Sequence, residues 1–156
     1  MSQDPRTLWI AELRATPDRL AALVRRCSPE VIDRKPSPKA FSAREVVHHL
    51  RDIEIEGHGA RLVRILAETE PSLPDVDGDL LAIERRYNAR PHEPALEEFR
   101  RARTEAVTRL EGLRPGEWAR TGHLDGVGTI TVERLVEIWR AHDRDHLEEM
   151  RRLVEV

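Results

Sequence analysis

Residues 131–153 read TVERLVEIWRAHDRDHLEEMRRL, and this stretch decides the fold that we predict. One set of residues recurs in it at alternating steps of three and four, which is the core-facing stripe of an amphipathic α-helix. The members of the stripe are Val132, Leu135, Trp139, His142, His146, Glu149 and Leu153. His142 and His146 therefore occupy core positions, one turn apart on the same face.

Three earlier helices have recognisable starts. Residues 42–45 read SARE, the S-x-x-E form of a capping box, and begin a helix that we expect to run to about residue 68. Thr16 followed by proline marks the start of the first long helix, because threonine can cap and proline suits the first helical position. Residues 6–15 are expected to form a short leading turn or helix. Leucine and phenylalanine at helical spacing predict another helix over 94–113.

Proline and glycine separate these helices. Three prolines interrupt residues 28–40, and residues 71–94 form a long polar connection with one short helix expected around 79–87. Residues 115–128 are a glycine-rich loop, and no segment predicts a strand. We therefore expect an all-α fold, a four-helix bundle with one long crossover connection, as a single domain over residues 1–156.

The composition argues against several classes of protein. The chain has 26 basic and 29 acidic residues, a formal net charge of −3, whereas a nucleic-acid binder needs a basic surface to neutralise phosphates. No apolar run approaches the length that spans a membrane, and the charged start, MSQDPRTLWIAELR, lacks a secretory segment. Cys27 is the only cysteine, which excludes an intrachain disulfide and fits a reducing compartment. We expect a cytoplasmic protein.

Histidines converge on the predicted core. His49 lies on the apolar face of the helix over 42–68, so it joins His142 and His146 inside the bundle. His48 lies nearer the polar side, and His58, nine residues beyond His49, should point outward because nine residues are half a revolution out of phase. Three neutral imidazoles leave open positions on a divalent ion, and they suit zinc, nickel, copper or iron. The alternative is that each histidine bonds a carbonyl or carboxylate.

Residues 41–54, FSAREVVHHLRDIE, resemble the W-S-x-x-E-v-l-x-H-L-x-D-x-E signature of the DinB-like family of DinB/YfiT metalloenzymes. Residues 122–124 (GHL), 128–131 (GTIT) and 142–147 (HDRDHL) extend the resemblance over nearly the whole chain. Phe41 replaces the usual tryptophan and Leu124 a common proline. The resemblance implies a four-helix bundle of the DinB/YfiT type and frequently a homodimer. It also implies a metal site formed by His49, His142 and His146, with nickel or zinc as the usual ion.

The resemblance further implies a metal-dependent enzyme acting on a small molecule, either a hydrolase or a transferase that uses a low-molecular-weight thiol such as bacillithiol or mycothiol. Asp52 and Asp143, with Glu54 and Asp145, are candidates to orient ligands or move protons. Cys27 follows an apolar stripe, and we interpret it as a small core residue. The alternative function is a stress-associated, non-catalytic metal-binding or interaction module. DNA binding is a third hypothesis, which the charge disfavours.

Overall fold

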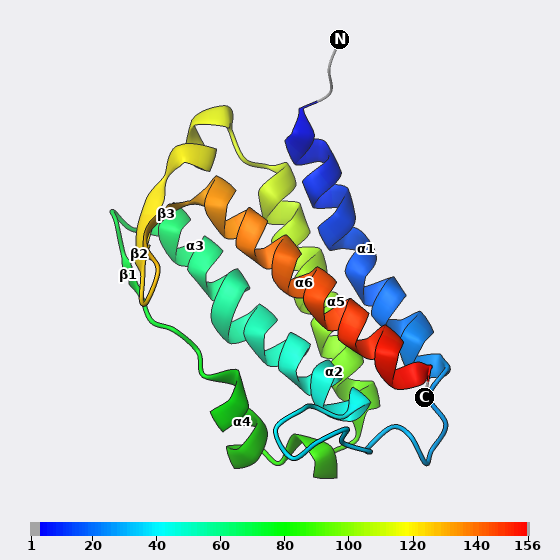
Figure 1. Ribbon diagram of the computed structural model, residues 1–156. Helices are drawn as coiled ribbons and strands as arrows, with labels where there is room; N and C mark the ends of the chain where they lie inside the picture. The colour runs from blue at the N-terminus through cyan, green and yellow to red at the C-terminus, as the bar shows by residue number, and fades with distance from the viewer. Residues whose placement is uncertain (1–3, 156) are drawn as a thin grey trace.

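The computed structural model describes residues 4–155, in which long helices lie side by side as a bundle (Figure 1). Residues 1–3 and 156, which belong to the predicted charged start and to the predicted end of the last helix, lie outside this range. The helical elements of the bundle are α1 (Pro5–Arg25), α2 (Ala43–Asp52), the π-helix η1 (Ile53–His58), α3 (Gly59–Ala67), α5 (His92–Glu111) and α6 (Val132–Val154). The segments α2, η1 and α3 follow one another without a break and act as one long helix. The predicted four-helix bundle is confirmed.

The first helix begins earlier than we expected. Asp4 caps α1, so the predicted start at Thr16 is wrong, and Pro17 lies inside the helix. A proline has no N–H to donate to the carbonyl four residues back, which here is that of Leu13. The Arg103 side chain donates to this carbonyl instead, with Nη1 2.8 Å from the oxygen. An arginine of α5 thus supplies the hydrogen bond that lets α1 continue through its proline.

The second long helix starts as predicted and then changes its winding. Ser42 and Glu45 form both hydrogen bonds of the capping box. Further along, the N–H of Gly59 donates to the carbonyl of Glu54, five residues back, which is the bond of a π-turn. A Cβ atom at Gly59 would lie 2.6 Å from that oxygen. Glycine is therefore the residue that this π-turn requires.

A small sheet at one end of the bundle corrects the prediction that the chain has no strand. Its strands are β1 (Ser72–Leu73), β2 (Thr121–Leu124) and β3 (Gly128–Thr131), and β2 pairs parallel with β1 and antiparallel with β3. Gly126 and Gly128, with φ of +77° and +109°, make the turn between the last two strands. Thr131 then caps α6 by accepting from the N–H of Arg134.

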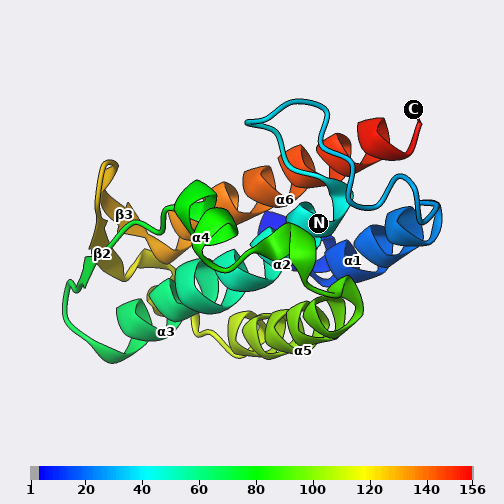
Figure 2. The ribbon, with the colours of Figure 1, turned by 90° about the horizontal axis from the view of Figure 1, so that it is seen from below.

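The long crossover after α3 folds back over α2. It carries α4 (Gly78–Glu84) and a short 3₁₀-helix, η2 (Tyr87–Ala89), close to the one short helix expected there. Figure 2 shows α4 beside α2. A further 3₁₀-helix, η3 (Pro115–Ala119), precedes the sheet. The crossover thus covers a face of α2 that the sequence pattern marks as polar.

The hydrophobic core has two parts. One cluster includes Leu13, Leu62 and Trp139, and the other includes Leu20, Leu50 and Met150. Buried polar residues occupy the middle of the bundle between the two, namely Thr16, His49, Glu54, His58, Arg103 and Asp143. Within residues 4–155, no helix combines the length and the apolar character needed to cross a membrane.

Candidate metal centre

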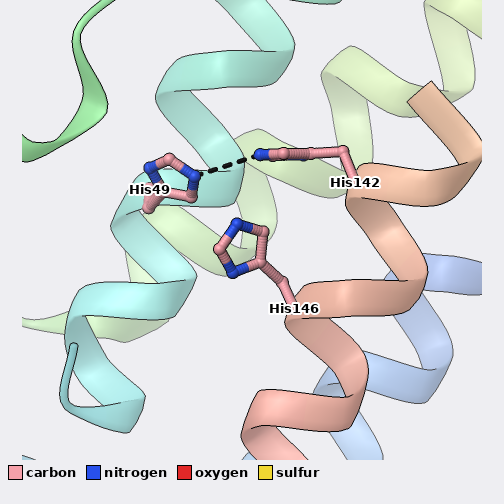
Figure 3. A group of neighbouring side chains, drawn as sticks. All are labelled: His49, His142 and His146. Atoms are coloured by element: carbon pink, nitrogen blue, oxygen red, sulfur yellow. Dashed lines mark hydrogen bonds between the residues drawn. The ribbon is translucent and has the colours of Figure 1, made fainter. Parts of the chain in front are cut away.

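The three predicted histidines meet at one side of this polar layer. His49 of α2 faces His142 and His146 of α6 (Figure 3). The Nε2 atoms of His49 and His142 are 3.1 Å apart, and one nitrogen from each of the three rings lies within 4.8 Å of the others. The ring centroids are 4.5 to 5.2 Å apart. The predicted convergence of these residues, which we call the triad, is present in the structure.

The surroundings of His49 and His142 favour their neutral form. Burial, with a smaller effect from nearby His146, lowers the pKa of His49 to about 3. Burial also lowers the pKa of His142, and neighbouring His58 adds to this shift. His49 is 7% exposed, whereas His142 and His146 are half-buried. A neutral imidazole has a free lone pair, so His49 and His142 are already in the form that binds a metal.

The spacing of the nitrogens fits one ion. Two imidazole nitrogens bound to the same tetrahedral zinc, each about 2.0–2.1 Å from it, lie roughly 3.4 Å apart. The distances within the triad differ from this value by amounts that small side-chain rotations can absorb. The Nδ1 edge of His49 lies against Gly78, where the Cβ of any larger residue would come within 2.8 Å of Nδ1, and its Nε2 is the nitrogen that faces His142. Three such ligands fill part of a coordination sphere and leave a position open.

One triad histidine is held by a carboxylate that sequence reasoning did not assign. Glu149 lies 3.0 Å from His146 Nδ1, through its Oε2. A carboxylate at this position fixes the tautomer and orientation of the ring and directs Nε2 toward the other histidines. Glu149 belongs to the core-facing stripe of α6, three residues after His146, so this spacing could have revealed its role.

The two aspartates predicted to orient ligands bond elsewhere. Asp52 accepts hydrogen bonds from Tyr87 and from arginines. Asp143 accepts from Thr16 at 2.7 Å and from Arg103 at 2.6 and 2.9 Å. Across residues 4–155, no hydrogen bond joins either aspartate to a triad ring. A direct ligand-orienting role for Asp52 and Asp143 is therefore not what the structure shows.

The other two acidic candidates also lie away from the triad rings. Glu54 is buried and accepts both a bidentate pair of hydrogen bonds from Arg103, at 2.8 Å each, and one from Trp139 Nε1 at 2.9 Å. Asp145 is exposed. Glu54, Arg103 and Asp143 thus form a buried ion network under the site.

The prediction that His48 lies nearer the polar side is wrong. His48 is 1% exposed, its Nε2 is 3.2 Å from the carbonyl oxygen of Arg90, and its ring stacks on Tyr87 at a centroid distance of 5.3 Å. Tyr87 and Arg90 both belong to the crossover. This segment covers the helix face that the sequence pattern alone would leave in solvent.

The prediction that His58 points outward is also wrong. His58 is 4% exposed, stacks on Trp139 at 5.3 Å and meets the ring of His142 edge-on at 5.0 Å. The prediction assumed a regular α-helix, in which nine residues from His49 give half a revolution. The π-turn absorbs one residue, which rotates His58 to the inside of the bundle.

Cys27 is half-buried and packs against one of the two hydrophobic clusters. It donates a weak hydrogen bond to the carbonyl of Leu23, with Sγ 3.7 Å from the oxygen, and burial raises its pKa. A raised pKa lowers the fraction of reactive thiolate. Cys27 therefore has the character of a small apolar residue.

Comparison with known proteins agrees with this fold. The family model described as the DinB superfamily matches residues 12–150. The chain belongs to the DinB superfamily. Among solved structures, this DinB superfamily protein is similar to YfiT from Bacillus subtilis, with a TM-score of 0.90 and 19% sequence identity, over 99% of this chain and 89% of that one. YfiT is described as a probable metal-dependent hydrolase with an unusual four-helix bundle topology. No curated protein matches the chain significantly.

Proposed function

We propose that this member of the DinB superfamily is a metal-dependent enzyme, a hydrolase or a thiol-dependent transferase that acts on a small molecule. His49, His142 and His146 hold its single divalent transition ion. The observation that carries the proposal is the meeting of three imidazoles from two helices, with His142 and His146 half-buried. A closed structural site would surround its ion with four protein ligands, whereas three ligands leave a position for a reactant.

The ion would supply the nucleophile, since a bound divalent metal lowers the pKa of water or of a thiol to near neutrality and polarises a carbonyl. The protein's own residues would position the ligating imidazole rings and shield them from solvent. Glu149 orients the ring of His146, Gly78 leaves room for the Nδ1 edge of His49, and Phe41 lies against the rings of His49 and His146. No cysteine nucleophile is needed, which agrees with the raised pKa of Cys27.

The nature of the donors narrows the choice of ion. Imidazole nitrogens suit zinc and nickel, and also iron or copper, whereas magnesium and calcium prefer oxygen ligands. We propose zinc or nickel. The description of YfiT as a probable metal-dependent hydrolase supports the hydrolytic form of the proposal. The thiol-dependent form rests on the same open position, since a thiolate is a good ligand for either ion.

The proposal is tested with zinc-loaded protein and two sets of substrates, chromogenic esters and amides for hydrolysis, and an electrophile with a low-molecular-weight thiol for transfer. Turnover in one set is expected, and a chelator or His142→Ala should abolish it. The control is His123→Ala, which removes an exposed histidine of β2 and should retain activity. Full zinc binding without turnover in either set would instead favour a non-catalytic metal-binding module.

A further inference from the structure

His58 is a buried polar side chain, 4% exposed, whose ring nitrogens make no hydrogen bond within the described part of the chain. Burying an imidazole with both nitrogens unpaired costs free energy, which natural proteins seldom accept without a reason. The burial of His58 with both ring nitrogens unpaired therefore requires an explanation.

The π-turn and the ring of Trp139 fix the position of His58. The π-turn that ends at Gly59 rotates His58 into the bundle, and such turns occur frequently at functional sites. The His58 ring stacks on Trp139, whose Nε1 is fixed by a 2.9 Å hydrogen bond to Glu54. Glu54 is in turn fixed by two bonds to Arg103. The buried network of Trp139, Glu54 and Arg103 therefore holds the ring of His58 in its orientation.

The remaining neighbours of the triad show what His58 can reach. Phe41 and Gly78 lie against His49, and Glu149 holds His146. His58 meets His142, with ring centroids 5.0 Å apart, which is within the range of the spacings inside the triad itself. Its nitrogens are not part of the group within 4.8 Å, so His58 lies beside the three ligands rather than among them.

We propose that His58 is the fourth histidine of the metal centre and donates a hydrogen bond to an oxygen of the small molecule bound at the position that the triad leaves open. This inference rests on the proposed function. A neutral imidazole has one N–H donor, so the ligands that His58 selects carry a carbonyl, carboxylate or hydroxamate oxygen beside the atom that binds the ion. His58 acts as a ligand-binding residue and not as a metal ligand.

The test uses cobalt(II)-loaded full-length protein and acetohydroxamate as the probe, because the visible absorption of cobalt reports both loading and ligand binding. His58→Phe keeps an aromatic ring against Trp139 and removes both nitrogens. We expect cobalt affinity to stay unchanged and acetohydroxamate affinity to fall about tenfold, the usual effect of one lost hydrogen bond. His58→Gln, which restores a donor, should recover part of that loss and also guards against misfolding of the first variant.

The matched control is His48→Phe, which removes a buried histidine of the same long helix that lies against the crossover and outside the triad. Its acetohydroxamate affinity should equal that of the wild type. Wild-type affinity in His58→Phe would overturn the inference while leaving the metal centre intact. Loss of cobalt from both His58 variants would make His58 a ligand and would also overturn the assigned role. Failure of the wild-type protein to bind cobalt would refute the proposed function itself.

Discussion

His146 is the triad residue whose ring lies within hydrogen-bond distance of a carboxylate, that of Glu149. Glu149→Ala should lower zinc affinity about 10- to 100-fold, the usual effect of removing a carboxylate that orients a ligating histidine. Glu148→Ala removes the adjacent carboxylate, which pairs with Arg151 near the surface, and should leave zinc affinity unchanged. Competition with a chromophoric chelator measures both. Equal affinities in the two variants would show that Glu149 does not orient the site.

At the same scale, the buried histidines make the metal-free protein sensitive to acid. The pKa of His49 is about 3 in the folded protein and about 6.5 in an unfolded chain. Between these values the unfolded chain binds a proton that the folded protein does not. The contribution of neutral His49 to the free energy of unfolding should therefore be fully present above about pH 6.5 and should decrease steadily as the pH falls toward 3. Urea denaturation of the chelator-treated protein over this range measures it.

His49→Leu is the comparison for this pH effect, since it removes one of the histidines kept neutral by burial. Its stability should fall less between about pH 6.5 and pH 4 than that of the wild type. An identical pH dependence in the two proteins would mean that His49 titrates normally. The contribution of His49 to metal binding should persist in the folded protein down to about pH 3, because the ring stays neutral above that pH and only a protonated imidazole cannot bind an ion.

At the scale of the secondary-structure element, Gly59 marks the π-turn. Helix propensity alone predicts that Gly59→Ala stabilises the helix by about 1 kcal/mol. The new Cβ would lie 2.6 Å from the Glu54 carbonyl oxygen, so we expect a net loss of about 1–3 kcal/mol instead. Gly112→Ala, whose Cβ would lie at an ordinary 3.6 Å from its nearest neighbour, should be nearly neutral. Urea denaturation separates the two, and equal stabilities would contradict the steric argument.

Some secondary-structure elements were predictable from the sequence and others were not. The apolar stripe of α6 is a repeating pattern of many residues, and the capping box at Ser42 marks the start of α2. Both helices and the inward positions of the three triad histidines were therefore predictable. Pro17 was misleading, because proline opens many helices and only the distant Arg103 lets one continue here. The strands have two to four residues, too few for a period to appear.

The inward orientation of His58 and the burial of His48 were not predictable from periodicity. His58 depends on one π-turn, and the pair Gly57 and Gly59 was the only local indication of irregular winding. His48 depends on the crossover, which reaches α2 from about forty residues further along the chain. Both facts arise from tertiary structure, whereas a helical pattern describes one regular helix at a time.

At the scale of the whole molecule, Arg103 links the helices of the bundle. Its guanidinium donates to Glu54 after α2, to Asp143 in α6 and to the Leu13 carbonyl in α1. All of these groups lie in the polar middle layer, and the side chains of Arg103 and Glu54 are at most 2% exposed. The network therefore fixes the relative positions of the helices that carry the triad.

Arg103→Met should destabilise the protein by about 3–5 kcal/mol, because it leaves two buried carboxylates without their cation. Arg100→Met is the control, since Arg100 pairs with Asp18 at the surface, and exposed pairs contribute about 0–1 kcal/mol. Denaturant titration of the metal-free variants measures both. A similar small cost for the two changes would show that the network does not hold the bundle together.

The central claim is that His49, His142 and His146 bind one divalent ion. The most direct test is metal content by mass spectrometry, on protein purified without a nickel column, for the wild type and for His49→Ala and His142→Ala. We predict close to one zinc, nickel, iron or copper ion per wild-type chain and almost none in either variant. A wild-type protein that contains no metal and takes up none on titration, or variants that keep their full metal content, would contradict the account.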